Sequence, residues 1–476
     1  MSSPSPVRAS RCGSNLLNLE LKVLPSRPVL GFLPEFRRDP LAFLTSLYQR
    51  WGDFVRYRMG MQDVYFMAHP DLVRQVLVEQ AHCFHKSRIL QRARLLLGDG
   101  LLTSEGELHK RQRRMLQPAF HRDRIAAYGS TMVELADELQ AGWRDGQVLD
   151  VAREMMRLAL LIAGRTLFSA DVAPYAARIS QSLDTLLGMF DLMLMPFADF
   201  LLQLPLPSTR RFEEARRELD TVVYHLIAER RASGQDKGDL LSMLLLAQEE
   251  DGQGRMSDRQ VRDEVMTILI AGHETTANAL TWTWYLISQA PEVEERLHQE
   301  WRHVLGGRRP SMDDLPRLSW TEMVVAESLR LYPPAWGIGR KAIRETTISG
   351  AVIPAGAICV LPPYAIHRRP DYYPDPERFL PERWTAEARA ERPRYAFLPF
   401  GAGPRMCIGE RFAWMELLLV LPTIGQNWRL TLAPDQTVVP QARITLRPRY
   451  GMRMRLERRD DTVADAPRSV GASAPK

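Results

Sequence analysis

The sequence predicts a mainly α-helical fold with a smaller strand-containing part towards its C-terminal end. Before Pro334, apolar side chains recur at the spacing of amphipathic helices. After Pro334, short alternating segments interrupted by Gly and Pro replace that pattern. With 476 residues, 45% of them hydrophobic, the chain can also bury a sizeable core.

Helices are predicted through the first two thirds of the chain. The segments, in order, are 41–51, 71–80, 105–116, 122–144, 151–168, 210–231, a long apolar helix from Ser257 to Gln289, and 318–331. Ser257 is a typical N-cap residue, because its hydroxyl can accept a hydrogen bond from a free backbone N–H of the first turn. Pro333 and Pro334 end the last helix, since proline lacks the N–H that a helix requires. Gly, Asp and Gln at 234–239 and 251–254 predict loops.

The segment after Pro334 is more varied. Alternation around Gly350 predicts short strands and turns at 347–360. The stretch 368–384 is rich in Pro, Asp and Arg and predicts an irregular meander. A helix is expected at 410–425, and a terminal hairpin at 444–456 that turns at 449–451.

Composition excludes several classes of protein. The net charge of +6 is mild, which does not favour a nucleic-acid-binding protein. The four cysteines form no Cys-x-x-Cys pair, so we expect neither a disulfide scaffold nor a zinc ribbon, and a cytoplasmic protein. The most apolar stretch, 186–206, contains Asp191, Pro196 and Asp199, so no transmembrane anchor is expected. We further expect a flexible segment at 1–24 and a disordered tail at 458–476.

The clearest chemical motif surrounds Cys407, in the sequence Phe-Gly-Ala-Gly-Pro-Arg-Met-Cys-Ile-Gly from Phe400 to Gly409. A lone cysteine is usually a small core residue. Here Gly403 and Gly409 allow a tight loop with backbone N–H groups close to the sulfur, and the start of the next helix favours a thiolate. Arg405 is placed to meet an anion, and Phe400 supplies an apolar wall. A thiolate with hydrogen bonds to its sulfur is a suitable axial ligand for haem iron.

This segment resembles the haem-binding loop of the cytochrome P-450 superfamily at every defining position. The resemblance covers residues 30 to 457 and implies haem b as cofactor, with Cys407 as the iron ligand and Phe400, Gly403 and Gly409 beside the haem. It implies the cytochrome P-450 fold, which has a large helical lobe and a smaller β-rich lobe. We therefore expect one domain over 25–457, although length alone would suggest two or three.

A second motif, Ala-Gly-His-Glu-Thr-Thr, begins at Ala271 inside the long helix. It could be a polar turn on a helix rim, but Gly272 and adjacent threonines weaken an apolar helix and require a reason. The motif resembles the oxygen-activation segment of the same family, where the helix is locally opened at the haem. Thr275 would then hold the oxygen and a water, and Glu274 would relay protons. A zinc-protease motif is excluded, since Ala277 stands where its second His would be.

Glu327 and Arg330 lie three residues apart on one predicted helix face and can pair. Most such pairs are exposed and contribute little to stability. In the family that the chain resembles, the pair joins an arginine of the meander in a buried ion cluster, and Arg383 stands at that position.

Basic residues are expected to bind the haem carboxylates and an electron donor. The resemblance assigns His109, Arg113, Arg340 and Arg405 to the carboxylates. Lys110, Arg111, Arg122 and Arg124 are either a solvated face or part of a basic surface for an acidic donor. We expect the donor to be a ferredoxin or flavodoxin with its reductase, O2 as the co-substrate, and a monomeric enzyme.

The substrate pocket is the part that the sequence specifies least. The resemblance maps Ala271, Trp336, Ile338 and Ile444 to it, although Trp336 could equally be a core residue. Apolar side chains there favour a lipophilic substrate, and we favour hydroxylation of a terpenoid over that of a fatty acid. Two other classes stay open: a thiolate-haem isomerase or dehydratase, and a haem gas sensor. The Glu274–Thr275 pair argues against the first, and the lack of a visible signalling domain against the second.

Overall fold

The computed structural model describes residues 19–25, 29–189, 192, 198–202, 204, 206–246 and 256–459. Most of 1–24 and 458–476 lies outside these residues, as do the whole loop 251–254 and part of the segment 186–206. Within the described ranges no helix combines the length and apolar character needed to cross a membrane.

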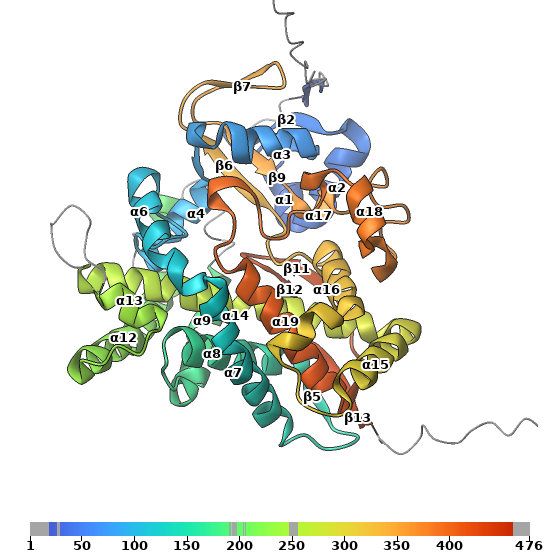
Figure 1. Ribbon diagram of the computed structural model, residues 1–476. Coiled ribbons are helices and arrows are strands. Elements are labelled where there is room, and N and C mark those ends of the chain that lie inside the picture. The colour runs from blue at the N-terminus through green and yellow to red at the C-terminus, as the bar shows by residue number, and fades with distance from the viewer. Residues whose placement is uncertain are drawn as a thin grey trace, which may run out of the picture.

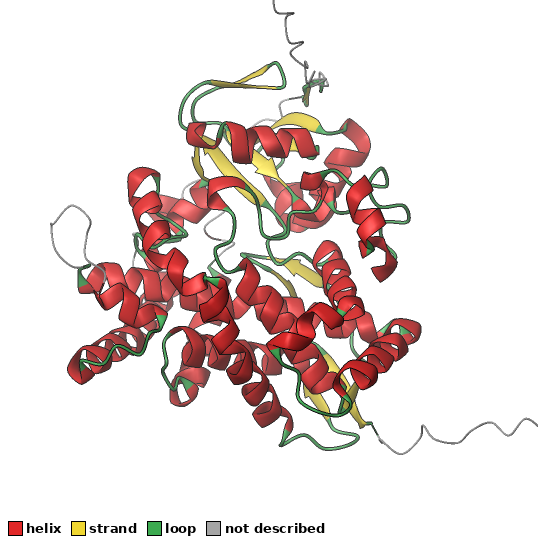
Figure 2. Ribbon diagram, in the orientation of Figure 1, coloured by secondary structure: helices red, strands yellow, loops and turns green. Residues whose placement is uncertain are grey.

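The fold is mainly helical, as predicted, and the helices fill most of the view in Figure 2. The α-helices are α1 (Leu33–Arg38), α2 (Pro40–Trp51), α3 (Pro70–Arg74), α4 (Arg88–Arg92), α5 (Arg94–Leu97), α6 (Gly106–Leu116), α7 (Arg122–Gln140), α8 (Val151–Leu167), α9 (Ala176–Gly188), α11 (Ala198–Leu201), α12 (Pro207–Ser233), α13 (Leu240–Leu246), α14 (Asp258–Ser288), α15 (Pro291–Leu305), α16 (Ser319–Leu331), α17 (Pro363–Ile366), α18 (Ala386–Glu391) and α19 (Glu410–Gly425). The predicted helix 71–80 is α3 followed by a π-helical turn, η1 (Gln75–Glu79). A 3₁₀ turn, η6 (Pro381–Trp384), lies in the predicted meander.

The strands form one larger sheet and three small ones. The larger sheet has the order β1 (Lys22–Val23), β2 (Phe54–Met59), β3 (Gln62–Met67), β9 (Ile358–Leu361), β6 (Ile338–Ala342), β4 (Phe84–Lys86). The small sheets are β10 (Trp428–Leu432) with β13 (Arg453–Arg458) and β5 (Val148–Asp150), β11 (Pro440–Ala442) with β12 (Leu446–Pro448), and β7 (Thr346–Ile348) with β8 (Ala351–Ile353). The larger sheet therefore joins strands from residues 22–86 with strands from residues 338–361.

The predicted terminal hairpin at 444–456 is wrong. Its two segments are strands, but β12 pairs with β11, and β13 pairs with β10 and β5. Only an isolated bridge joins Arg449 to Gly451. Each segment finds a better partner elsewhere because the pairing of short strands depends on how the lobes pack.

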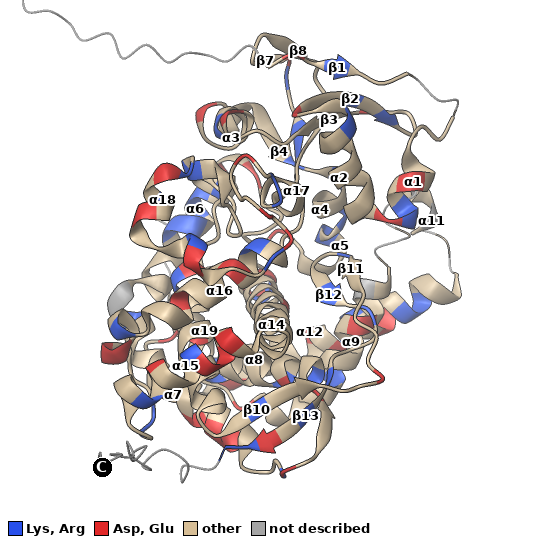
Figure 3. Cartoon of the chain, turned by 90° about the vertical axis from the view of Figure 1, so that its right-hand side faces the viewer, with Lys and Arg blue, Asp and Glu red and all other residues tan. Residues whose placement is uncertain are grey.

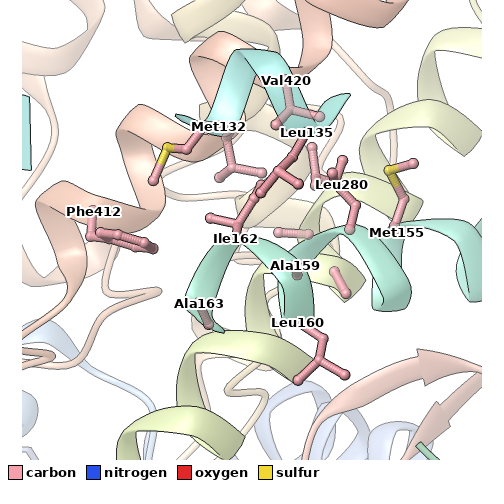
Figure 4. Close-up of a cluster of buried hydrophobic side chains, with 14 of the residues drawn as sticks. Met132, Leu135, Met155, Ala159, Leu160, Ile162, Ala163, Leu280, Phe412 and Val420 are labelled. Atoms are coloured by element: carbon pink, nitrogen blue, oxygen red, sulfur yellow. The ribbon is translucent and has the colours of Figure 1, made fainter. Parts of the chain in front are cut away.

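The two larger of three hydrophobic clusters correspond to the expected two lobes. The larger core gathers side chains from α7, α8, α14 and α19, and Figure 4 shows them converging, with Leu280 of α14 beside Met155 of α8. The smaller core lies around the six-stranded sheet and α2 and α3. In Figure 1 this sheet lies at the top and the helices α7, α8 and α19 lie below it.

Helix α14 is the central element of the larger lobe, and Figure 3 looks nearly along its axis. It begins with the capping box that Ser257 predicted: the Ser257 hydroxyl accepts from the Gln260 N–H, and the Gln260 side chain accepts from the Ser257 N–H. Most of its residues are buried, from Val261 to Ile287, which lets one long helix pass through the core.

Candidate functional site

A tight loop places Cys407 just before α19. Gly401 and Gly403 both have positive φ, and a Cβ at Gly403 would lie 1.8 Å from the carbonyl oxygen of Leu77. Only glycine allows this close approach of the two backbones. The Cys407 N–H donates to the Phe400 carbonyl at 2.9 Å, which closes the loop.

The thiol of Cys407 is exposed, and the Gly409 N–H donates to it. Burial of the surrounding loop raises the pKa of Cys407, and the Gly409 hydrogen bond lowers it only in part. The expected thiolate at Cys407 therefore stays a prediction that depends on the bound cofactor. A metal ion on the sulfur would supply the missing stabilisation, because a coordinating thiol is deprotonated.

The middle of α14 is open on one side, although the helix is buried elsewhere. Ala271 is exposed, Gly272 and Thr275 are partly exposed, and a Cβ at Gly272 would meet nothing within 4 Å. The predicted local opening of the helix is not observed, since the helical assignment continues from Asp258 to Ser288. The Thr275 hydroxyl instead donates to the Ala271 carbonyl at 2.7 Å.

Cationic side chains gather close to Cys407. Burial and the neighbouring Arg340 and Arg405 lower the pKa of Lys86 to about 7. Burial also lowers the pKa of Arg340 to about 10, with Arg405 the next cause. The pKa of His109 falls to about 3, because the ring is desolvated and faces Arg405, Lys86 and Arg113.

Glu105 is the one acid among the charges that act on Lys86. It pairs with Arg405, and its carboxylate accepts from the Lys86 N–H at 2.6 Å. Burying several cations against one carboxylate is unfavourable unless further anions join them. The two carboxylates of a haem fit this surplus of positive charge, with the thiol of Cys407 available to its iron.

The predicted carboxylate-binding residues are thus brought together, and Lys86 is a member that the sequence analysis missed. It ends β4, and its backbone pairs with that of Arg340 in β6. The only signal for Lys86 in the sequence was its place at the end of the aromatic strand Phe-His-Lys. Arg113 donates to the Met406 carbonyl at 2.8 Å, so it also supports the loop.

Glu274 is buried against the segment that carries Thr445. Its carboxylate accepts from the hydroxyl of Thr445 at 2.5 Å, and burial raises its pKa. The neighbouring His273 is buried as well, and desolvation lowers its pKa to about 4, so it is a neutral core residue.

Glu327 and Arg330 of the predicted ion cluster are fully buried, and the side chain of Arg383 is 9% exposed. Arg330 donates to both oxygens of Glu327 at 2.8 Å, and Arg383 donates to Oε1 of Glu327 at 3.2 Å. The Trp384 indole N–H donates to the other oxygen at 2.9 Å. The Glu327–Arg330 pair is therefore not an exposed surface pair, and the cluster connects α16 to η6.

His367 connects this cluster to the Cys407 loop, and the sequence analysis missed it. Its Nδ1 lies 3.2 Å from the Arg330 carbonyl, and its Nε2 accepts from the Leu398 N–H at 3.0 Å. The ring is therefore neutral, and burial holds its pKa well below the ordinary value. Leu398 lies two residues before Phe400, so α16 helps to fix the loop.

The predicted pocket residues have different surroundings. Trp336 is buried, packs near Phe36 and donates to the Arg443 carbonyl at 2.8 Å, so the structure assigns it a packing role. Ile338 lies near Gly401, since a Cβ there would be 3.8 Å from its Cδ1. Ile444 is 42% exposed.

The cytochrome P-450 family model matches residues 22–452 of the chain. Cyclooctat-9-en-7-ol 5-monooxygenase of Streptomyces melanosporofaciens is 42% identical over 421 residues, 87% of this chain and 90% of that protein. Cyclooctatin synthase of the same organism is 40% identical over 422 residues, 88% of this chain and 92% of that protein. Pentalenene oxygenase of Streptomyces avermitilis is 40% identical over 435 residues, 91% and 96% of the two chains.

Proposed function

The chain belongs to the cytochrome P-450 family and is a monooxygenase, and we propose that it hydroxylates a terpenoid with electrons from a separate donor protein. Its cofactor is a haem with iron. We assign haem b, because the four cysteines form no Cys-x-x-Cys-His motif for covalent attachment. When bound, a thiolate-ligated haem supplies the activation of O2.

The residues of the chain would hold and serve this cofactor. Cys407 would bind the iron, and the Gly409 N–H would tune the electron density on its sulfur. Lys86, Arg340 and Arg405 would bind the haem carboxylates and lose their mutual repulsion in doing so. Thr275 would bind oxygen and water beside the open face of Gly272, and Glu274 would supply protons.

The terpenoid proposal rests on the relatives, which are named for such substrates and share about nine tenths of their length with this chain. Ala271, Ile338 and Ile444 offer small or aliphatic surfaces that suit a hydrocarbon. A fatty-acid hydroxylase would need a group to hold the carboxylate, and none of these three side chains supplies one.

We also propose that the donor is a ferredoxin or flavodoxin, and that the enzyme works in the cytoplasm. The cysteines that the structure describes, Cys83, Cys359 and Cys407, are all free, which suits a reducing compartment. Lys110 is exposed on α6, and Figure 3 shows Lys and Arg along this helix. Arg124 is exposed too, whereas the side chain of Arg122 lies outside the described residues.

Two spectra test the proposal. The reduced, CO-bound protein should show the strongly red-shifted Soret band of thiolate ligation, and Cys407→Ala should abolish it. A cyclic terpene should then cause a saturable high-spin shift in the oxidised enzyme, and fatty acids of equal carbon number should not. A shift with fatty acids alone would overturn the substrate class but not the family.

Turnover separates the remaining alternatives. A monooxygenase requires both a reductant and O2, with one labelled oxygen atom found in the product. Product formed without either would identify an isomerase or dehydratase. Gas binding with no turnover of any terpene or fatty acid would favour a sensor.

A further inference from the structure

The carboxyl group of Glu274 is held by a loop far away in sequence. The turn between β11 and β12 places Thr445 against α14, where its hydroxyl donates to Oε1 of Glu274 at 2.5 Å. The Asn278 amide donates to the same hydroxyl at 3.1 Å. Trp282 donates to the carbonyl of the next residue, Leu446, at 3.0 Å.

The spacing on α14 explains this contact. Glu274, Asn278 and Trp282 follow one another at intervals of four, so they lie on one face of the helix. The turn 443–446 packs against that face of α14, and the three polar side chains of the face are all buried. Because buried polar groups are costly to separate from their partners, the turn is held in one position.

The hydrogen bonds also fix where a proton on Glu274 resides. A hydroxyl has one proton to donate, and that of Thr445 is directed at Oε1 while Asn278 occupies its acceptor side. Oε1 therefore accepts, and when the carboxyl is protonated its own proton lies on Oε2. Among the described residues, no side chain or backbone group forms a hydrogen bond with Oε2.

A charged pair connects the same site to the protein surface. Arg447, two residues after Thr445, pairs with Asp184 of α9 at 3.2 Å, and the Asp184 side chain is 73% exposed. These are the two charged groups that act on the Glu274 carboxyl: Arg447 lowers its pKa and Asp184 raises it. The Arg447–Asp184 pair is therefore close enough to act on Glu274, and its Asp184 side chain faces solvent.

We propose that Thr445 is a positioning residue for proton delivery: supported by Asn278, it holds the Glu274 carboxyl with its proton on Oε2, beside the Arg447–Asp184 pair that faces solvent. This rests on the proposed role of Glu274 as a proton donor. The overall reaction converts substrate R–H, O2, two electrons and two protons into R–OH and water. Without ordered proton supply, the same electrons and protons reduce O2 to hydrogen peroxide.

The test compares Thr445→Val, Thr445→Ser and Glu274→Gln in the haem-loaded enzyme. Thr445→Val removes the donor that stabilises the charged carboxylate, so the pKa of Glu274, followed by its infrared carboxyl band, should rise by about one pH unit. Glu274→Gln assigns the band. Product formed per electron should fall several-fold in Thr445→Val, with peroxide in its place, and Thr445→Ser should restore both readouts.

Two further variants keep the outcome interpretable. Thr423→Val removes a buried hydroxyl that donates only to the Leu419 carbonyl, and it should change neither readout. Asn278→Ala should shift both readouts in the same direction as Thr445→Val. If Thr445→Val does not show the CO-bound thiolate band, and so is not correctly folded, Asn278→Ala serves as the test in its place. Unchanged coupling in Thr445→Val, with loss in Glu274→Gln, overturns the role of Thr445. Unchanged coupling in Glu274→Gln overturns the proton-donor role itself.

Discussion

The cationic side chains of the proposed haem site repel one another when no anion balances their charge. Lys86 is the extreme case, since burial and three arginines bring its pKa close to neutrality. An anion at this site would favour its charged form. If Cys407 binds the iron as proposed, its raised pKa means that a proton would be released on binding.

Lys86→Met should therefore weaken haem retention. The apolar side chain fills the same space but offers no charge to a haem carboxylate, so haem transfer to excess apomyoglobin should be about ten-fold faster, the equivalent of one lost charged hydrogen bond. Lys110→Met is the matched control, because Lys110 is exposed and pairs only with Glu107. Equal transfer rates for both variants would remove Lys86 from the site.

The buried Glu264 makes the free energy of unfolding fall as pH rises. Its Oε2 accepts from the Leu101 N–H at 2.9 Å, and burial raises its pKa to about 8. The unfolded chain releases this proton near pH 4.5, but the folded chain keeps it, so stability is lost as pH rises from about 4.5 to 8.

Glu264→Gln should remove that loss. Relative to wild type, its free energy of unfolding should increase by about 1.4 kcal/mol for each pH unit between pH 5 and 7.5. Urea unfolding at several pH values measures this difference. Glu322→Gln, an exposed side chain, should show none. Parallel pH profiles for Glu264→Gln and wild type would contradict the prediction.

At the scale of elements, the Glu327 cluster fastens α16 to the chain that leads into the Cys407 loop. Its three charged members are buried, so one missing partner leaves an uncompensated charge. Glu327→Gln should destabilise the protein by about 3–5 kcal/mol. Urea unfolding checks this, and Glu322→Gln should change stability by less than about 1 kcal/mol because its partner Arg389 is exposed.

The start of α14 depends on one hydroxyl. Ser257→Ala removes the side-chain half of the capping box and should cost about 1 kcal/mol, whereas Ser257→Asp, which can still cap, should cost less. Thermal unfolding of the three proteins compares them. Equal losses for Ala and Asp would mean that the cap does not contribute.

Helices were predictable from sequence because their apolar spacing and caps are local. The predicted helix 410–425 matches α19, and 151–168 differs from α8 by one residue. The strands at 444–456 were also found, but their partners were not. Strand pairing joins segments that lie far apart in the chain, and a short alternating pattern does not identify its partner.

At the scale of the molecule, two lobes share one site. The larger core supplies α14 and α19, and the smaller supplies β4 and β6 with Lys86 and Arg340. Length alone suggested two or three domains, but strands from residues 22–86 and from residues 338–361 join one sheet. The single domain over 25–457 that the resemblance implied stays a prediction.

The proposed docking of an electron donor depends on charges at the protein surface. Lys110→Glu with Arg111→Glu should slow association with an acidic ferredoxin by ten-fold or so at low salt and flatten its salt dependence, since steering depends on opposite charge. Stopped-flow reduction at several ionic strengths measures this. Arg211→Glu with Arg217→Glu on α12 is the matched control. Equal effects from both pairs would place the docking surface elsewhere.

The sequence by itself identified the residues that we propose for the chemistry. The Cys407 motif, the Glu274–Thr275 pair and the Glu327–Arg330 pair each lie within a few neighbouring residues, so local spacing reveals them. Only the tertiary structure decided what surrounds them: Lys86 beside Arg340, Thr445 on Glu274, and Trp336 in the core. The physical reason is that burial and hydrogen-bond partners are set by segments remote in sequence, and these contacts control pKa and orientation.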